Sequence, residues 1–149
     1  MEREHDGATR LRLPREERTV LKSAVTQLRA LVSGDDDEAL TRLYPPAYAH
    51  DEQAEAEYRS LMHDDMLSHR LTAIDTVLST LEAESLDAEQ TGAWMGVVND
   101  IRLVLGTRLD ISESLDLDRL PDDDPNIASY ALYAYLSWLL EQFVEAVSK

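Results

Sequence analysis

Apolar residues recur every three or four positions through most of the chain, which is the spacing of one face of an α-helix. The first such stretch predicts a helix from about Pro14 to Val32, because proline suits a first helical position and Gly34 follows as a stop. An aspartate triplet then predicts a short capped helical turn at about residues 38–43. The Tyr-Pro-Pro-Ala-Tyr segment at residues 44–48 interrupts the chain.

Two longer helices are predicted in the middle of the sequence. The first covers about residues 51–84, and its apolar stripe weakens around residues 63–65, where we expect a bend or a break. Asp87 is expected to cap the second, with Gln90 three positions later as its capping-box partner. The apolar face of this helix continues to about Leu109.

The last predicted helix begins near residue 125 and is apolar nearly all round to about residue 147. Such a helix lies inside a core or shares an oligomer interface, and the pattern leaves both open. Residues 1–13 are expected to be an extended or flexible arm, since a lone strand there would have no partner. The sequence therefore predicts an all-α domain at residues 14–149, an antiparallel bundle of four to five helices with a largely buried C-terminal helix at its centre.

Charge narrows the range of partners. The chain has 149 residues and a net charge of −16. Residues 1–33 carry seven basic and five acidic residues, so the remaining 116 residues hold a net charge of about −18. A field of this sign repels phosphate backbones and anionic membranes, so we expect no direct binding of nucleic acid or membrane. A protein partner with a basic surface is the easier target.

The absence of cysteine excludes several kinds of chemistry. Disulfides, thiolate nucleophiles, cysteine-ligated metals and thiol redox switching all require that residue. The charged N-terminal residues do not resemble a signal peptide, and no apolar run approaches the ~20 residues of a membrane span. We therefore expect a cytoplasmic protein.

Two residues form a weak candidate metal site. Asp65 and His69 stand four positions apart in a helical pattern, so they can share one helix face. Two ligands do not make a site, and a solvated pair is the commoner role for a helical carboxylate and imidazole. A metal-dependent hydrolase that also uses His63 and Asp64 is the least favoured alternative, and we expect no metal and no cofactor.

Other catalytic signatures do not occur. The aspartates after residue 115 fail the EF-hand pattern, because Pro121 stands where that loop needs glycine. The sequence contains no nucleophile elbow, no Walker A motif and no dinucleotide-binding glycine motif. We therefore predict that the protein is not an enzyme.

Several residues are candidates for an interaction site rather than a catalytic one. Arg108 shares a helix face with apolar residues. There it forms a structural ion pair inside the bundle, extends toward solvent at the helix end, or provides a site for an anion or partner. Aromatic residues near the C-terminus suit either a core or an interface. The candidates are Arg102, Arg108, Tyr130, Tyr133 and Trp138.

Three blocks of residues carry a family likeness. The first joins residues 44–48 and 55–59 to Asp64-Asp65, and the second is Trp94 with residues 99–109. The third is Tyr-Ala-Tyr-Leu-Ser-Trp-Leu at residues 133–139. Together they resemble the AosR family of small actinobacterial cytosolic proteins, over about residues 10–147.

This resemblance implies an oxidative-stress transcriptional regulator that works with a stress sigma factor or another part of RNA polymerase. It also implies a redox signal sensed by paired cysteines, and this sequence departs from the family there because it has none. The leading hypothesis is thus a non-enzymatic regulator that binds a component of the transcription machinery. A helical homodimer with a scaffolding role is the alternative.

Overall fold

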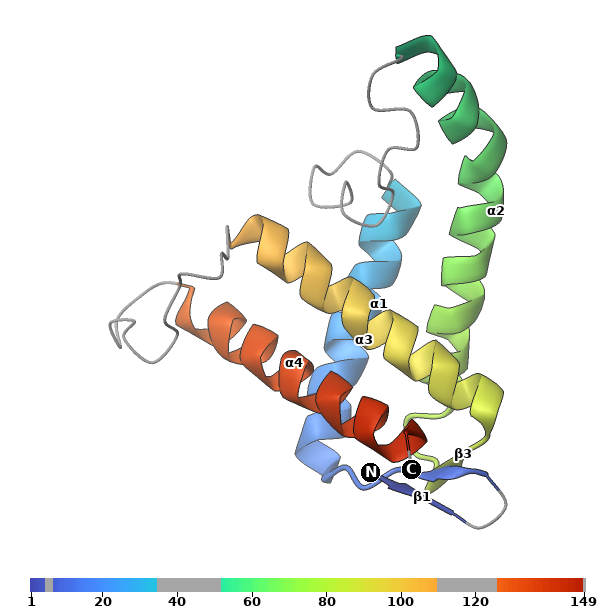
Figure 1. Cartoon of the computed structure of the whole chain (residues 1–149). Coiled ribbons are helices and arrows are strands. Elements are labelled where there is room, and N and C mark those ends of the chain that lie inside the picture. The colour runs from blue at the N-terminus through green and yellow to red at the C-terminus, as the bar shows by residue number, and fades with distance from the viewer. Residues whose placement is uncertain (5–6, 35–51, 110–125, 149) are drawn as a thin grey trace.

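The computed structural model describes residues 1–4, 7–34, 52–109 and 126–148, and for most residues between 52 and 64 it describes the backbone alone. This part of the chain is mainly helical. Its helices are α1 (Arg15–Gly34), α2 (Glu52–Ser79), α3 (Ala88–Arg108) and α4 (Ile127–Val147) (Figure 1). Its strands are β1 (Glu2–Arg3), β2 (Thr9–Arg10) and β3 (Ser85–Leu86).

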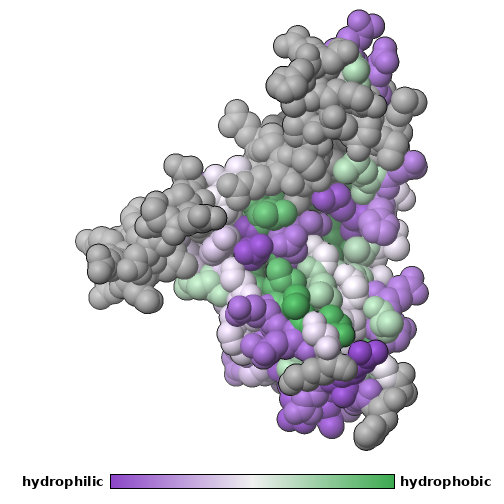
Figure 2. All heavy atoms as spheres, viewed as in Figure 1, coloured by the Kyte–Doolittle hydropathy of each residue, from purple (hydrophilic) through white to green (hydrophobic). Residues whose placement is uncertain are grey.

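Helix α3 lies at the centre of the molecule. It packs against α2 on one side and α4 on the other, and it also contacts α1 and β3. Trp94 of α3 is fully buried, and its indole N–H donates a hydrogen bond to Thr80 Oγ1 at 2.8 Å. The Phe143 ring of α4 lies 6.0 Å from the Trp94 ring, centroid to centroid. Figure 2 shows apolar residues gathered on the visible face where α3 and α4 run side by side.

The N-terminal residues belong to a small antiparallel sheet with the strand order β1-β2-β3. Thr9 pairs with Arg3 on one side and with Leu86 on the other. The Leu11 N–H continues this pairing with a 2.8 Å hydrogen bond to the carbonyl of Glu84. The expectation that a strand here would lack a partner is therefore wrong, because its partner is a two-residue strand more than 70 positions away.

The predicted helix boundaries are confirmed for α1 and α3 to within two residues. Helix α2 runs without a break through residues 63–65, so the predicted interruption there is wrong. It ends at Ser79, earlier than predicted, because a turn at residues 80–83 leads into β3. The helical turn predicted at residues 38–43 and the loop after residue 110 lie outside the described residues.

Helix α4 is not the central helix that its apolar sequence predicts. It buries Leu136, Leu139 and Phe143 against α3, but Trp138 and Val144 on its other faces are exposed. The reason is that one buried stripe accommodates only part of an all-round apolar helix, and the remaining alanine and aromatic side chains lie at the surface. No helix in the described ranges is long and apolar enough to cross a membrane.

Candidate interaction surface between α1, α3 and α4

An apolar groove of about 230 Å³ opens on the surface where α1 and α4 both rest on α3. Helices α1 and α4 pack on α3 without extensive contact between them, so side chains of α3 form the floor of the gap. Apolar side chains dominate the lining: Val20, Ala24, Leu28 and Leu31 from α1, Ile101, Val104 and Leu105 from α3, and Leu132 from α4. Ser23, Gln27 and Arg108 supply its polar atoms.

The sequence of α1 explains why one wall of the groove is apolar. The buried stripe of α1 uses Leu21, Val25 and Leu28, which repeat at helical spacing. Val20 precedes Leu21 by one residue, so it projects about 100° away from that stripe. Its side chain is 49% exposed, and it faces the groove rather than the core.

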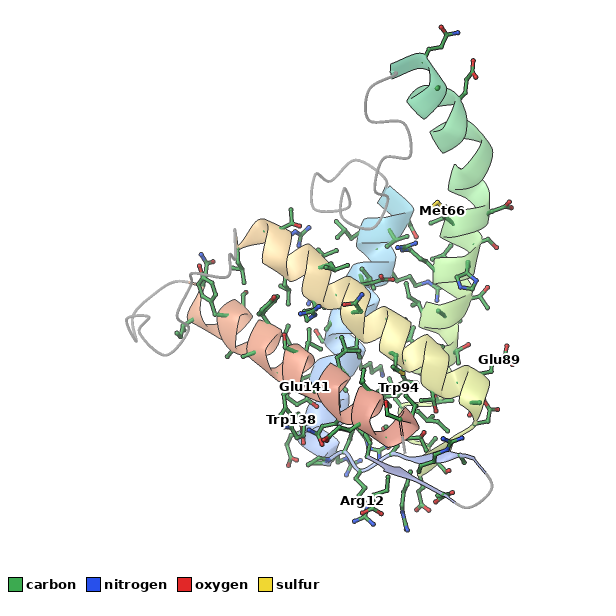
Figure 3. The ribbon with its side chains drawn as sticks, in the orientation of Figure 1. Arg12, Met66, Glu89, Trp94, Trp138 and Glu141 are labelled. Atoms are coloured by element: carbon green, nitrogen blue, oxygen red, sulfur yellow. The ribbon has the colours of Figure 1, made fainter. Side chains whose placement is uncertain are left out.

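An aromatic pair extends the apolar surface along α4. The Tyr135 and Trp138 rings lie 6.0 Å apart, and Trp138 is 51% exposed, the most exposed of the large apolar side chains in the described part of the chain. Burial, followed by the nearby Glu17 carboxylate of α1, raises the pKa of the Tyr135 phenol above its ordinary value. Tyr135 thus lies near α1 and in contact with Trp138, which Figure 3 labels on α4.

Carboxylates lie near Val20 and near Trp138. Helix α4 contains no lysine or arginine, and Glu141 and Glu145 lie exposed one and two turns after Trp138. On α1, Glu16 and Glu17 precede Val20 by one turn. Because residues three and four apart share a helix face, Glu16 and Glu17 lie beside Val20, and Glu141 lies beside Trp138. Figure 3 shows Glu141 close to Trp138 on α4.

Arg108 is the cation among the described residues that line the groove. Arg108 is exposed, which agrees with a side chain that extends from the helix end rather than with one buried inside the bundle. The helical wheel placed it correctly on the face of Ile101 and Leu105, because all three line the same groove. Its position in the last turn of α3 carries its side chain past the end of the packed core.

The remaining interaction candidates lie on the opposite flank of α4. The guanidinium carbon of Arg102 is 5.9 Å from the Tyr133 ring centroid, and Arg102 Nη2 donates to Asn99 Oδ1 at 3.2 Å. The Tyr130 hydroxyl donates a long hydrogen bond of 3.5 Å to the carbonyl of Leu109. Of the five candidates, Arg108 therefore lines the groove and the other four do not.

The candidate metal pair is not part of a larger ligand cluster in the described residues. Asp65 and His69 are both exposed on α2, and no group of three or more histidine, aspartate or glutamate side chains in that part of the chain is arranged to hold a metal. A neighbouring carboxylate, that of Asp100 on α3, forms an ion pair with Arg70 of α2 at 3.4 Å from Arg70 Nε. Burial raises the pKa of Asp100, although Arg70 and then His69 oppose that shift. The side chains of His63 and Asp64 lie outside the described residues.

Val20 and Leu132 are groove residues that the sequence analysis did not single out. Both belong to apolar stripes that predict a core, and periodicity does not tell which edge of a stripe is left open. The available signal was the adjacent pair Val20-Leu21, since neighbouring residues of a helix point about 100° apart and one of them can lie at the edge of the buried stripe.

Comparison with known proteins places these features in a family. Residues 1–147 match the family model described as "Domain of unknown function (DUF2017)". The chain is similar to the proteins named "Oxidative stress regulator AosR" from Mycobacterium bovis and from Mycobacterium tuberculosis strain H37Rv, with 31% identity over 114 residues in each case. The alignment covers 74% of this chain and 49% of each relative, so the chain spans about half the length of the curated relatives it matches. No solved structure matches it significantly.

Proposed function

Since the chain belongs to the DUF2017 family, as its match over residues 1–147 shows, we propose that it is a non-enzymatic regulatory protein that binds a protein component of the transcription machinery. The observation that carries this proposal is the exposed apolar groove formed by α1, α3 and α4. The relatives named as oxidative stress regulators favour a role in the same kind of response. A sigma factor or another RNA polymerase subunit is the partner we expect.

The physical case for a protein partner rests on exposed apolar surface. Water exposure of a tryptophan ring is costly, and interface hot spots are enriched in tryptophan, tyrosine and arginine. Arg108 lines the groove, and the aromatic pair of Tyr135 and exposed Trp138 lies on α4, which also contributes to the groove. The net charge of −16 favours a basic protein surface over nucleic acid, so we propose that any effect on transcription is indirect.

The signal cannot be a thiol switch inside this chain, because the chain has no cysteine. We propose that the oxidative signal is sensed by the partner or by another protein, and that this chain contributes the binding surface. On this proposal, the binding role of the chain needs only the groove, and the chemistry that senses the oxidative signal takes place in another protein.

The test is a binding experiment with the chain as bait in lysate of its native host, at about 50 mM and 500 mM salt. We expect recovery of a sigma factor or an RNA polymerase subunit at low salt and its loss at high salt, since opposite charges are screened over about 10 Å at 0.1 M. Binding of the purified subunit to the purified chain then confirms a direct contact. An unrelated acidic helical protein of similar charge is the control bait.

Recovery of no transcription protein at either salt concentration would remove the proposal. If the chain recovered only itself and light scattering gave a dimer, the homodimeric scaffold would become the better account. Helix α4 makes that alternative specific, because its exposed Trp138 and Val144 could be covered by a second copy.

A further inference from the structure

We infer that the groove between α1, α3 and α4 binds a small apolar carboxylic acid, with its carboxylate against Arg108 and its hydrocarbon tail among the apolar side chains. Binding of such an acid does not require the proposed protein partner, so it goes beyond the proposed function. It gives the same surface a ligand of defined charge and chemical class.

The lining of the groove changes character along α3. Its α3 residues are Ile101, Val104, Leu105 and Arg108, which stand at i, i+3, i+4 and i+7 on one helix face. Three apolar side chains therefore form a row that ends at the guanidinium, which the last turn of α3 carries toward solvent. A ligand that lies along this row needs an apolar body and one anionic end.

Arg108 is the residue that selects the charge of the ligand. The other polar residues of the lining, Ser23 and Gln27, are neutral, and Gln27 Nε2 donates a hydrogen bond to Ser23 Oγ at 3.2 Å. A guanidinium has five N–H donors in a planar fork that matches a carboxylate. Arg108 can therefore bind a ligand carboxylate in addition to its contacts within the protein. A cationic ligand would instead meet a like charge.

The size of the groove favours a small ligand over a peptide. Its volume of about 230 Å³ lies below the roughly 300–1,000 Å³ of pockets for drug-sized molecules. An acidic peptide or a second copy would bring many carboxylates toward a chain of net charge −16, whereas a single carboxylate meets little of that repulsion. We therefore assign the groove to a monocarboxylic acid with a short hydrocarbon chain.

The probe is octanoate, and its two charge analogues are octanol and octyltrimethylammonium. The whole protein and the groove favour opposite charges, because the net charge of −16 attracts the cation and Arg108 attracts the anion. We expect calorimetric titration of the purified chain to show one saturable site for octanoate. Octanol should bind about fivefold more weakly and the cation about tenfold more weakly, since neither can pair with the guanidinium.

The length of the hydrocarbon chain tests the apolar part of the groove. Each methylene that the groove removes from water should tighten binding by about two- to fourfold. Butanoate, hexanoate and octanoate should therefore bind with increasing affinity. Equal affinities along this series would show that the tail stays in water, and the inference would fail.

Matched variants test the cation. Arg108→Gln removes the charge at the groove, whereas Arg29→Gln removes the same charge from an exposed arginine of α1 that pairs with Asp75 of α2 and does not line the groove. We expect Arg108→Gln to weaken octanoate binding about fivefold and Arg29→Gln less than about twofold. Arg108→Lys keeps the charge but loses the planar fork, so its affinity should fall between those of the wild type and Arg108→Gln.

A second pair of variants tests the position of the tail. Val20→Glu puts a carboxylate on the groove wall, whereas Val144→Glu makes the same change outside the lining, at a valine of similar exposure (49% against 45%). Both variants add one negative charge at the surface, so general repulsion of octanoate changes equally. We expect Val20→Glu to weaken binding about fivefold and Val144→Glu less than about twofold, with unchanged helix content by circular dichroism.

Tighter binding of octyltrimethylammonium than of octanoate would overturn the inference. Equal effects of Arg108→Gln and Arg29→Gln, or the lack of any saturable octanoate site, would do the same. A dimer that light scattering detects without ligand, and that is lost only in Val20→Glu, would assign the groove to a second copy instead.

The ligand site and the proposed function can fail separately. The titrations use the purified chain alone, so octanoate binding at Arg108 would stand even if no transcription protein were recovered. If a transcription protein bound the chain but octanoate showed no saturable site, the ligand site would fail while the regulatory function stood.

Discussion

The guanidinium of Arg18 is partly buried, and its hydrogen bonds go to backbone carbonyls rather than to a carboxylate. Its Nε donates to the carbonyl of Leu13 at 2.9 Å, and Nη1 donates to that of Ala83 at 2.9 Å. The same side chain also donates to the carbonyls of Leu11 and Leu81. One residue thus ties the start of α1 to both segments that lead into and out of the sheet.

We expect Arg18→Ala to lower the free energy of unfolding by about 2–4 kcal/mol, because four carbonyls lose a charged donor at a partly buried site. Urea unfolding monitored by circular dichroism measures this loss.

Arg12→Ala is the matched control. Arg12 pairs with Glu2 at 3.0 Å, and both side chains are more than half exposed, so its loss should cost under about 1 kcal/mol. Equal losses for the two variants would show that the carbonyl contacts of Arg18 contribute little.

Residues that act through local contacts were predictable from the sequence, and residues that act across the fold were not. Asp87 and Gln90 are three positions apart, so their capping box follows from spacing alone. Arg18 reaches carbonyls 63 and 65 positions away, and no local pattern encodes that contact. The exposure of Trp138 likewise depends on which face α4 turns toward α3.

At the scale of the element, α3 shows how a helix start is defined by its flanking residues. Asp87 Oδ1 accepts from the Gln90 N–H at 2.7 Å, and Gln90 Oε1 accepts from the Asp87 N–H at 2.9 Å. Directly after this cap, Thr91 and Trp94 are buried. The cap therefore fixes the register in which the central helix presents its apolar residues.

Asp87→Ala should destabilise the protein by about 1 kcal/mol, because the Gln90 N–H loses its side-chain acceptor, whereas the backbone N–H of residue 87 can still donate to Gln90. Thermal unfolding by calorimetry is the measurement. Glu82→Ala, an exposed acid just outside α3, serves as the control and should change stability by less than about 0.5 kcal/mol. A cost as large for Glu82→Ala would point to charge rather than to the cap.

Helix α4 and the sheet show where prediction at the element scale fails. Apolar periodicity finds a helix but does not tell how many of its faces are covered, so α4 was placed at the centre that α3 occupies. Strands of two residues carry no periodicity at all. The groove could not be predicted either, because its lining comes from three helices whose relative placement no local pattern encodes.

At the scale of the whole molecule, the net charge of −16 is spread over a small protein. Like charges at this density repel one another, and the repulsion destabilises the compact folded state more than the expanded chain. Three ion pairs lie in the described residues, Arg12–Glu2, Arg29–Asp75 and Arg70–Asp100. They leave most of the acidic excess unbalanced.

Added salt should therefore stabilise the fold. Between about 20 mM and 500 mM sodium chloride, we expect the midpoint of thermal unfolding to rise by roughly 3–8 °C, as screening relieves repulsion worth about 1–2 kcal/mol. Potassium chloride at the same ionic strength should give the same rise, which separates screening from the effects of a particular ion. A midpoint that falls with salt would mean that ion pairs outweigh the repulsion.

The sheet also brings the two ends of the chain together. Arg3 of β1 donates to the carbonyl of Val147 at the end of α4, and Figure 1 shows the N and C labels side by side. A donor and an acceptor dye attached at the two ends would thus transfer energy efficiently in the native state and poorly once the chain expands. The distance between the two ends therefore reports whether the chain is folded. Folding can be followed in single molecules in this way, without a label near the groove.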